Sequence, residues 1–264
     1  MSPDDVAKIW EANAEAWTVM SRAGYDRCRD LFNTPAFMAM LPSVDGLRGI
    51  DVGCGEGQNT RDLADRGARM SAIDLAPTFV RHAREHEQDK PRQIDFLQAS
   101  ASAIPFEDDS FDFATAFMSL QDIAEQERAL AEVRRVVRPG GFFQFSITHP
   151  CFQTPRWSWV LDENQRRVAL MVGDYFDRPS CRVEEWTFGA APEALRQRYS
   201  KFRTPYFEHT LSDWLNMILA AGFELERFEE PTPDDATLAA HPREYDARIV
   251  AYFLIIRGRV PASR

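Results

Sequence analysis

The sequence predicts an α/β fold in which a doubly wound, mostly parallel sheet carries helices on both faces. Three observations support this prediction. Short apolar runs alternate with amphipathic helical patterns between residues 47 and 148. Three glycines, Gly53, Gly55 and Gly57, follow the first apolar run and lead directly into a helical pattern. A last helix and two further apolar strands follow near the end of the chain.

The N-terminal segment, residues 1–45, is expected to form a helical cap. Ser2 is an N-cap candidate, and Pro3 occupies the first helical position, where the N–H that it lacks would have no partner. Thr34 begins a second, shorter helix over residues 36–41. The apolar residues of the first helix recur mainly at helical spacing, at Val6, Ile9, Trp10, Trp17 and Met20.

The glycine loop after the strand at residues 47–52 is the most informative stretch. Glycine adopts positive φ and lets bare backbone approach a ligand that a Cβ would exclude. A strand, a glycine turn and a helix in this order are typical of a site for a nucleotide-like cofactor. The dinucleotide fingerprint requires a glycine where this chain has Gln58, which disfavours NAD. A turn without a ligand is the alternative, but it needs fewer glycines.

The second expected strand, residues 69–73, ends at Asp74. A carboxylate at this position of a doubly wound sheet accepts hydrogen bonds from the two hydroxyls of a ribose. Asp74 can instead cap the helix expected over residues 77–89. That helix carries His82 and His86 on one face, but no third ligand is suggested nearby, so we predict no metal site.

Three further strands are expected at residues 94–98, 111–118 and 142–148, with a helix from residue 123 that Pro139 and two glycines end. Residues 119–122 follow the fourth strand at the carboxyl edge, where open α/β sheets bind their ligands. Gln121 and Asp122 are therefore candidates for the binding pocket.

Residues 150–208 break the alternation and are expected to form a lid inserted over the site. They hold 11 aromatic residues in 59, about 19% against 12% for the whole chain. These aromatics either form a substrate pocket or only pack the lid. Residues 209–264 then supply a helix, a loop over 231–245 and two strands, at 223–228 and 249–256.

Composition restricts the class of substrate. The net charge of −10 and the pI near 5.1 oppose nucleic-acid binding, which depends on clustered Lys and Arg. Four cysteines lie far apart, which suits a reducing cytoplasm. No leader and no apolar run long enough for a membrane span is evident. We expect a soluble, cytoplasmic protein with no membrane partner; the oligomeric state is left open.

The segment from Asp51 to Gly57 resembles motif I of the class I S-adenosylmethionine-dependent methyltransferases. A block from Ser100 to Asp112 and the turn at residues 138–141 resemble two further blocks of small-molecule members. The resemblance implies a single Rossmann-like domain over residues 1–264, with the cofactor-binding core at 46–149. Its seven strands would have the order 3-2-1-4-5-7-6, with the seventh antiparallel.

The resemblance also implies site residues. Ser100 stands where the family often has an Asp that accepts from the adenine amino group. Expected cofactor-binding residues are Asp51, Gly53, Cys54, Gly55, Gly57, Asp74, Leu75, Ser100, Ala101 and Met118. Expected substrate-binding residues are Trp17, Tyr25, Gln121, Asp122, Trp157, Tyr175 and Tyr199.

The function that this resemblance implies is transfer of a methyl group from S-adenosylmethionine to an O, N or C nucleophile of a small metabolite. The alternatives are an NAD-dependent oxidoreductase and a non-catalytic S-adenosylmethionine-binding module. His149, at the end of the fifth strand, is the candidate general base and His209 its rival. Both histidines have structural alternatives, a turn contact for His149 and a helix cap for His209, and the sequence does not identify the acceptor.

Overall fold

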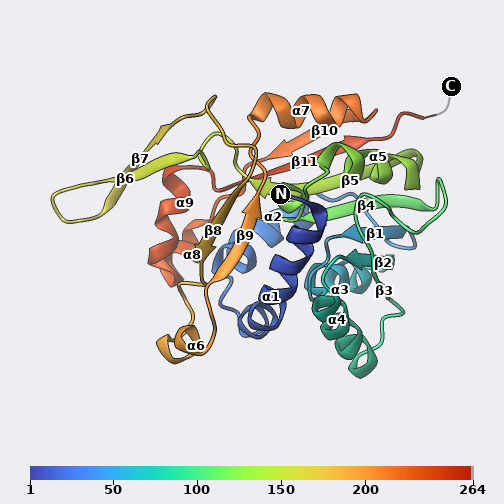
Figure 1. Ribbon diagram of the computed structural model, residues 1–264, viewed down its shortest axis with the longest axis horizontal. Helices are drawn as coiled ribbons and strands as arrows, with labels where there is room; N and C mark the ends of the chain where they lie inside the picture. The colour runs from blue at the N-terminus through green and yellow to red at the C-terminus, as the bar shows by residue number, and fades with distance from the viewer. Residues whose placement is uncertain (263–264) are drawn as a thin grey trace.

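The computed structural model describes residues 1–262, which form a seven-stranded sheet with helices on both faces (Figure 1). The strands of the sheet are β1 (Arg48–Val52), β2 (Arg69–Asp74), β3 (Asp95–Gln98), β4 (Phe111–Phe117), β5 (Val137–Thr148), β10 (Glu224–Glu229) and β11 (Phe253–Arg259). Their order is β10-β11-β5-β4-β1-β2-β3. Only β11 runs antiparallel to its two neighbours, so the predicted fold and strand order are confirmed.

Two sets of helices cover the sheet (Figure 1). One set is α3 (Gln58–Asp65) and α4 (Pro77–Asp89), and the other is α5 (Gln126–Val136) and α7 (Leu211–Ala220). Each set buries apolar side chains against the sheet; Leu63 and Val80 do so on the first face, Leu130 and Trp214 on the second. A short 3-10 helix, η2 (Leu120–Asp122), follows β4. The carboxyl ends of β1, β2 and β4 are therefore held by packing on both sides.

The N-terminal segment consists of α1 (Pro3–Arg22), the π-helix η1 (Arg29–Asn33) and α2 (Thr34–Met40). Ser2 and Asp5 form a reciprocal capping box at the start of α1. Asn13 in α1 donates to the carbonyl of Arg203 at 2.7 Å and accepts from its N–H at 3.1 Å. This pair joins α1 to a strand almost two hundred residues away.

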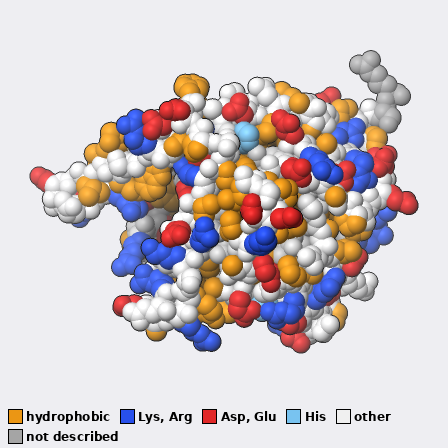
Figure 2. Space-filling view, in the orientation of Figure 1, with side chains coloured by type: hydrophobic (Ala, Val, Ile, Leu, Met, Phe, Trp, Pro, Cys, Tyr) orange, Lys and Arg blue, Asp and Glu red, His pale blue; other side chains and the backbone are white. Residues whose placement is uncertain are grey.

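Residues 150–208 contain two antiparallel strand pairs. They are β6 (Arg156–Leu161) with β7 (Arg167–Gly173), and β8 (Arg182–Trp186) with β9 (Phe202–Tyr206), the second pair flanking α6 (Glu193–Arg198). The β6–β7 hairpin projects from the body and carries exposed apolar side chains (Figures 1 and 2). Trp157 is 47% exposed and Met171 62% exposed. The sequence signalled the break in alternation here, but not these strands.

Three expectations about element boundaries differ most from the structure. The expected loop at residues 231–245 contains α8 (Asp235–Ala240) and η3 (Pro242–Tyr245), and α9 (Asp246–Ile249) follows it. Asp234 begins α8 because its side chain accepts the N–H of Thr237 at 2.7 Å. Since α9 extends to Ile249, β11 starts at Phe253 instead of Ile249.

The third boundary concerns β5, which begins at Val137 and not at Phe142. Val137 pairs with Phe111, and regular pairing resumes where Phe142 meets Phe113, so the expected turn at residues 138–141 is an irregularity inside the strand. Among residues 1–262, no helix combines the length and apolar character needed to cross a bilayer.

Candidate functional site

A cavity of about 830 Å³ lies at the carboxyl ends of β1, β2 and β4. Its wall also includes side chains from α1, such as Trp10 and Trp17, and from β8, such as Glu184 and Trp186. Segments from the beginning, middle and later part of the chain thus meet at the sheet edge where α/β folds bind ligands.

The glycine loop between β1 and α3 forms part of the cavity wall. Gly53, Gly55 and Gly57 have φ values of +73°, +55° and +87°, a backbone region that other residues rarely adopt. A Cβ at Gly55 would meet no atom within 4 Å, because this backbone faces the open cavity. A Cβ at Gly53 would lie 2.5 Å from the Cβ of Ser119. Gly55 therefore offers a ligand bare backbone, while Gly53 permits close packing.

Asp51 lies behind the loop and not in the cavity wall. Its side chain is 2% exposed and accepts hydrogen bonds from Thr60 at 2.6 Å and Thr115 at 2.8 Å. Burial raises the pKa of this carboxyl, and the two hydroxyl donors oppose that rise. Asp51 thus fixes β1 to α3 and β4. Gly57 is likewise outside the cavity wall, and its Cα faces the ring of Phe96.

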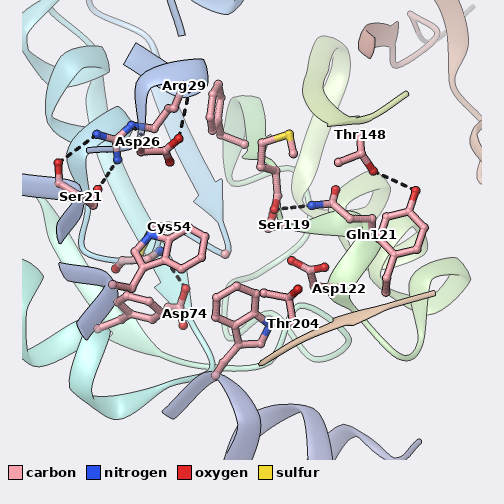
Figure 3. A pocket seen from close by; sticks show the side chains of 18 of the residues that line it. Ser21, Asp26, Arg29, Cys54, Asp74, Ser119, Gln121, Asp122, Thr148 and Thr204 are labelled. Atoms are coloured by element: carbon pink, nitrogen blue, oxygen red, sulfur yellow. Dashed lines mark hydrogen bonds and ion pairs between the residues drawn. The ribbon is translucent and has the colours of Figure 1, made fainter. Parts of the chain in front are cut away.

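Asp74, at the end of β2, does line the cavity (Figure 3). One carboxylate oxygen accepts the N–H of Gly55 at 2.8 Å, and the other accepts the N–H of Ala76 at 2.9 Å. Burial raises the pKa of Asp74 to about 6, although both N–H groups favour the ionised form. Each oxygen retains a lone pair for a further donor, so this carboxylate beside bare glycine backbone fits a ligand with two neighbouring hydroxyls.

Five other predicted cofactor-binding residues lie in the same wall. They are Cys54, Leu75, Ser100, Ala101 and Met118. The hydroxyl of Ser100 accepts the N–H of Ser102 at 3.2 Å. Met118 has a φ of +54°, and its carbonyl accepts the side-chain amide of Gln121 at 2.7 Å. The residue after β4 is therefore held in the left-handed conformation by a neighbouring cavity residue.

A buried charge network supports the loop from below. Glu56 is 4% exposed and contacts Arg61, which is 2% exposed, at 2.8 Å, and Arg22 at 2.8 Å. Burial opposes ionisation of Glu56, but the ion pairs with Arg61 and Arg22 outweigh it and lower the pKa of Glu56. The network joins α1 to the glycine loop.

Four predicted substrate-binding residues line the cavity: Trp17, Tyr25, Gln121 and Asp122. Figure 3 shows Asp122 pointing into the cavity on the side away from Cys54 and Asp74. Burial raises the pKa of Asp122 well above its ordinary value, and the charge of Glu184 adds to the rise. The cavity thus has a hydroxyl-accepting end and, opposite it, an end with a buried carboxyl group whose pKa is raised.

Aromatic rings form much of the wall between these ends. Trp17 packs edge-on against Trp186 and Phe188, with ring centroids 5.4 Å and 5.0 Å away. The indole N–H of Trp186 donates to the hydroxyl of Thr204 at 2.9 Å. Their edge-to-face packing holds α1 against β8 and keeps the rings in place around the cavity.

The other three predicted substrate-binding residues lie outside the cavity wall. Trp157 is on the projecting β6–β7 hairpin. The hydroxyl of Tyr175 accepts the N–H of Leu211 at 3.0 Å, at the start of α7. Tyr199 packs beside the Trp17 cluster without reaching the cavity. Aromatic content alone does not distinguish these rings from the ones that line the cavity.

Neither predicted catalytic histidine lines the cavity. His149 is 4% exposed; its Nδ1 accepts the N–H of Cys151 at 3.2 Å, and its Nε2 lies 2.8 Å from Glu230. His209 contacts the side chain of Gln126 and packs against Trp214. Burial lowers the pKa of both imidazoles. The contact of His149 with the turn after β5 matches the structural alternative that the sequence left open.

The sequence analysis missed several residues of the cavity wall. They include Asp26, Arg29, Asn33, Thr148, Glu184 and Tyr206. The side-chain oxygen and nitrogen of Asn33 are buried and have no hydrogen-bond partner within residues 1–262. Arg29 hydrogen-bonds Ser21, while burial raises the pKa of Asp26 to about 6 (Figure 3). No motif marks these residues, because distant segments bring them to the cavity.

Comparison with known proteins agrees with this geometry. Residues 50–145 match the family model described as "Methyltransferase domain". The chain is 32% identical over 155 residues to the demethylmenaquinone methyltransferase of Renibacterium salmoninarum, which covers 57% of this chain and 62% of the relative. It is 29% identical over 181 residues to the fatty-acid O-methyltransferase of Mycolicibacterium smegmatis. This match covers 64% of this chain and 65% of that relative. The chain thus spans less than two thirds of the length of these curated relatives.

A solved structure gives a longer match. The S-adenosylmethionine-dependent methyltransferase from Mesorhizobium loti superimposes with a TM-score of 0.69 at 29% identity. The superposition covers 85% of this chain and 96% of that one. It therefore extends well beyond residues 50–145.

The charge network under the glycine loop generates a stability prediction. Glu56→Gln keeps the side-chain shape but leaves Arg61 buried without its counter-charge. We expect the free energy of unfolding at pH 7 to fall by about 3 kcal/mol. The pKa of Glu56 is lowered by folding, so its stabilisation is present above the unfolded pKa and is lost as pH falls through the folded-state pKa. Urea denaturation should show the difference shrinking as the pH falls below the unfolded-state pKa of Glu56 and through its lower folded-state pKa.

Glu163→Gln is the matched control, because Glu163 is exposed in the turn between β6 and β7. This variant should have the same free energy of unfolding as the wild type at pH 7 and at acidic pH. Equal stability of the two variants at pH 7 would contradict a structural role for the network.

Proposed function

With a methyltransferase domain of the class I, S-adenosylmethionine-dependent type at residues 50–145, we propose that this chain methylates a small-molecule acceptor. The observation that carries the proposal is the cavity itself. The cavity of about 830 Å³ combines the bare backbone of Gly55 with the carboxylate of Asp74 at one end and continues to a second end near Asp122. A module that only binds the cofactor has no need of the second end.

The residues around Gly55 and Asp74 fit the cofactor. The two carboxylate oxygens of Asp74 would accept the ribose hydroxyls, and Ser100 with the backbone of Ala101 would contact the adenine. The open space at Gly55 accommodates a ligand against the loop. Gln58, in place of the third fingerprint glycine, argues against NAD.

When bound, S-adenosylmethionine supplies a methyl group whose bond to sulfur breaks, with the electron pair left on sulfur, as an acceptor lone pair forms the new bond. The chain's own contribution is alignment and exclusion of water. The ring cluster around Trp17 and Trp186 gives the cavity an apolar wall, and Gln121 and Asp122 supply polar groups that orient the acceptor. A general base at His149 or His209 stays a prediction that the cavity geometry does not support.

We further propose that different segments of the chain have different roles. Residues 46–149 hold the cofactor, and residues 209–264 complete the sheet. Residues 1–45 and 150–208 serve as cap and lid over the bound molecules. Support comes from Trp17 and Trp186, which line the cavity from these two segments and pack against each other. A small acceptor also agrees with the names of two curated relatives, which give demethylmenaquinone and a fatty acid as the acceptors of those proteins.

The first prediction is that S-adenosylhomocysteine binds this chain and that Gly55→Val abolishes the binding. The new side chain would project into the cavity where the ligand approaches the backbone. Gly46→Val is the matched control, because Gly46 also has a positive φ of +74° and open space at its Cβ, but lies outside the cavity wall. Titration calorimetry should detect binding to the wild type and the control only. Tighter binding of NAD than of S-adenosylhomocysteine would overturn the assignment.

The second prediction concerns pH. Ribose hydroxyls favour the ionised form of Asp74, so binding lowers its pKa from about 6. Affinity for S-adenosylhomocysteine should therefore be constant above about pH 7 and weaken as pH falls through about 6. Asp74→Asn should lower the affinity at pH 7 by about tenfold or more and flatten the profile.

Burial also raises the pKa of Asp26, which lines the same cavity, to about 6. Comparing the pH profiles of the wild type and Asp74→Asn therefore shows whether Asp74 is the titrating group. Asp95→Asn, at the exposed start of β3, is the control and should keep the wild-type profile. An unchanged profile in Asp74→Asn would assign the pH dependence to another group.

The third prediction tests the cap and lid. Limited trypsin digestion should cut more slowly around α6 and α1 when S-adenosylhomocysteine is bound, because closure would protect these segments. Arg166, in the turn of the projecting hairpin, supplies an internal reference whose cleavage should not change. Identical cleavage around both helices, with and without the ligand, would leave the lid without support.

A further inference from the structure

The carboxyl group of Asp122 has no partner among the residues that the structure describes. Asp122 is only 9% exposed, yet within residues 1–262 no donor hydrogen-bonds its carboxyl oxygens and no cation pairs with them. Figure 3 shows the group turned into the cavity with no marked interaction. A buried carboxylate without compensation is costly, so its partner is expected to arrive from the cavity.

The charges around Asp122 favour a positive partner. The negative charge of Glu184 contributes to the raised pKa of Asp122, because both side chains are acidic. Arg182 pairs with both Glu184 and Glu208, and Arg178 pairs with Glu208. Within residues 1–262, no arginine pairs with Asp122. Around the whole cavity, seven Asp and Glu line the wall against three Arg.

The aromatic wall points in the same direction. The rings of Trp17, Trp186 and Phe188 line the cavity, as does Tyr206, whose ring already lies 5.0 Å from the guanidinium carbon of Arg182. The faces of such rings attract cations, and the attraction is stronger where water is excluded. An anionic acceptor would instead face Asp122, with which no cation within residues 1–262 pairs. The observations thus select a ligand that is cationic or becomes so.

We propose that the acceptor presents a basic nitrogen to Asp122, so that this chain methylates an amine-bearing small molecule. The inference rests on the proposed methyltransferase function and adds the class of acceptor. A protonated amine has no free electron pair; the carboxylate of Asp122 takes one proton from it, becomes a carboxylic acid and leaves a neutral amine. The raised pKa of Asp122 suits it to accept that proton.

Binding of three probes of similar size tests the proposal: phenethylamine, 2-phenylethanol and 3-phenylpropionate. Each is titrated calorimetrically into protein saturated with S-adenosylhomocysteine. We expect the amine to bind about tenfold or more tightly than the alcohol, and the acid to bind least, because a charged hydrogen bond to Asp122 is available only to the amine. An amine that binds no better than the alcohol overturns the proposal.

Asp122→Asn should remove the preference for the amine while S-adenosylhomocysteine still binds, which also shows that the variant is folded. Asp89→Asn is the matched control, because Asp89 is exposed at the end of α4. It should keep the preference. Persistence of the preference in Asp122→Asn would assign the selectivity to another group and overturn the proposal.

A second experiment follows the reaction itself. The protein is incubated with isotope-labelled S-adenosylmethionine and a metabolite extract, and labelled products are sorted by charge at pH 7. Label in basic products supports the proposal, whereas label only in neutral or acidic products overturns it. Failure of wild-type protein to bind S-adenosylhomocysteine would instead refute the proposed function, so the two failures are distinguishable.

Discussion

Asp51 holds together the three elements on which the site depends. Its buried carboxylate accepts one hydrogen bond from Thr60 on α3 and one from Thr115 on β4, while its backbone belongs to β1. Donors offset the cost of burying a carboxylate, and here both donors come from elements that must meet for the glycine loop to form. The loop therefore acquires its shape from hydrogen bonds behind it, and its cavity face is left free for a ligand.

The opposite wall depends on contacts between distant parts of the chain. Asn13 binds the backbone of Arg203, and Trp17 packs against Trp186, so α1 is attached to the β8–β9 pair by both polar and apolar contacts. Arg22 connects α1 to Glu56 in the glycine loop. The same helix thus contacts both walls, which couples the geometry of the acceptor end to that of the cofactor end.

The sequence predicted the parts of the structure that local pattern determines. The glycine loop, Asp74 and the strand order follow from the short-range signals of turns and strands together with the family motif. The role of Asp51 was not evident, because Thr60 and Thr115 reach it only after the sheet is assembled. For the same reason, the sequence could not show that the Nε2 atom of His149 contacts the carboxylate of Glu230. Signals for β6 and β7 were absent because these strands form an exposed hairpin without a buried face.

The left-handed backbone of Met118 makes the residue at position 121 depend on the residue at position 118. A non-glycine residue with φ of +54° is under strain of about 1 kcal/mol or more, and the amide of Gln121 helps to hold it by binding its carbonyl. Glycine at position 118 would remove that strain and make the brace unnecessary. A chain with glycine at position 118 would tolerate replacement of Gln121, whereas a chain with a side chain at 118 would lose a brace when Gln121 is replaced. The side chain that faces the cavity at position 121 is therefore easier to exchange once the backbone at 118 no longer needs the brace.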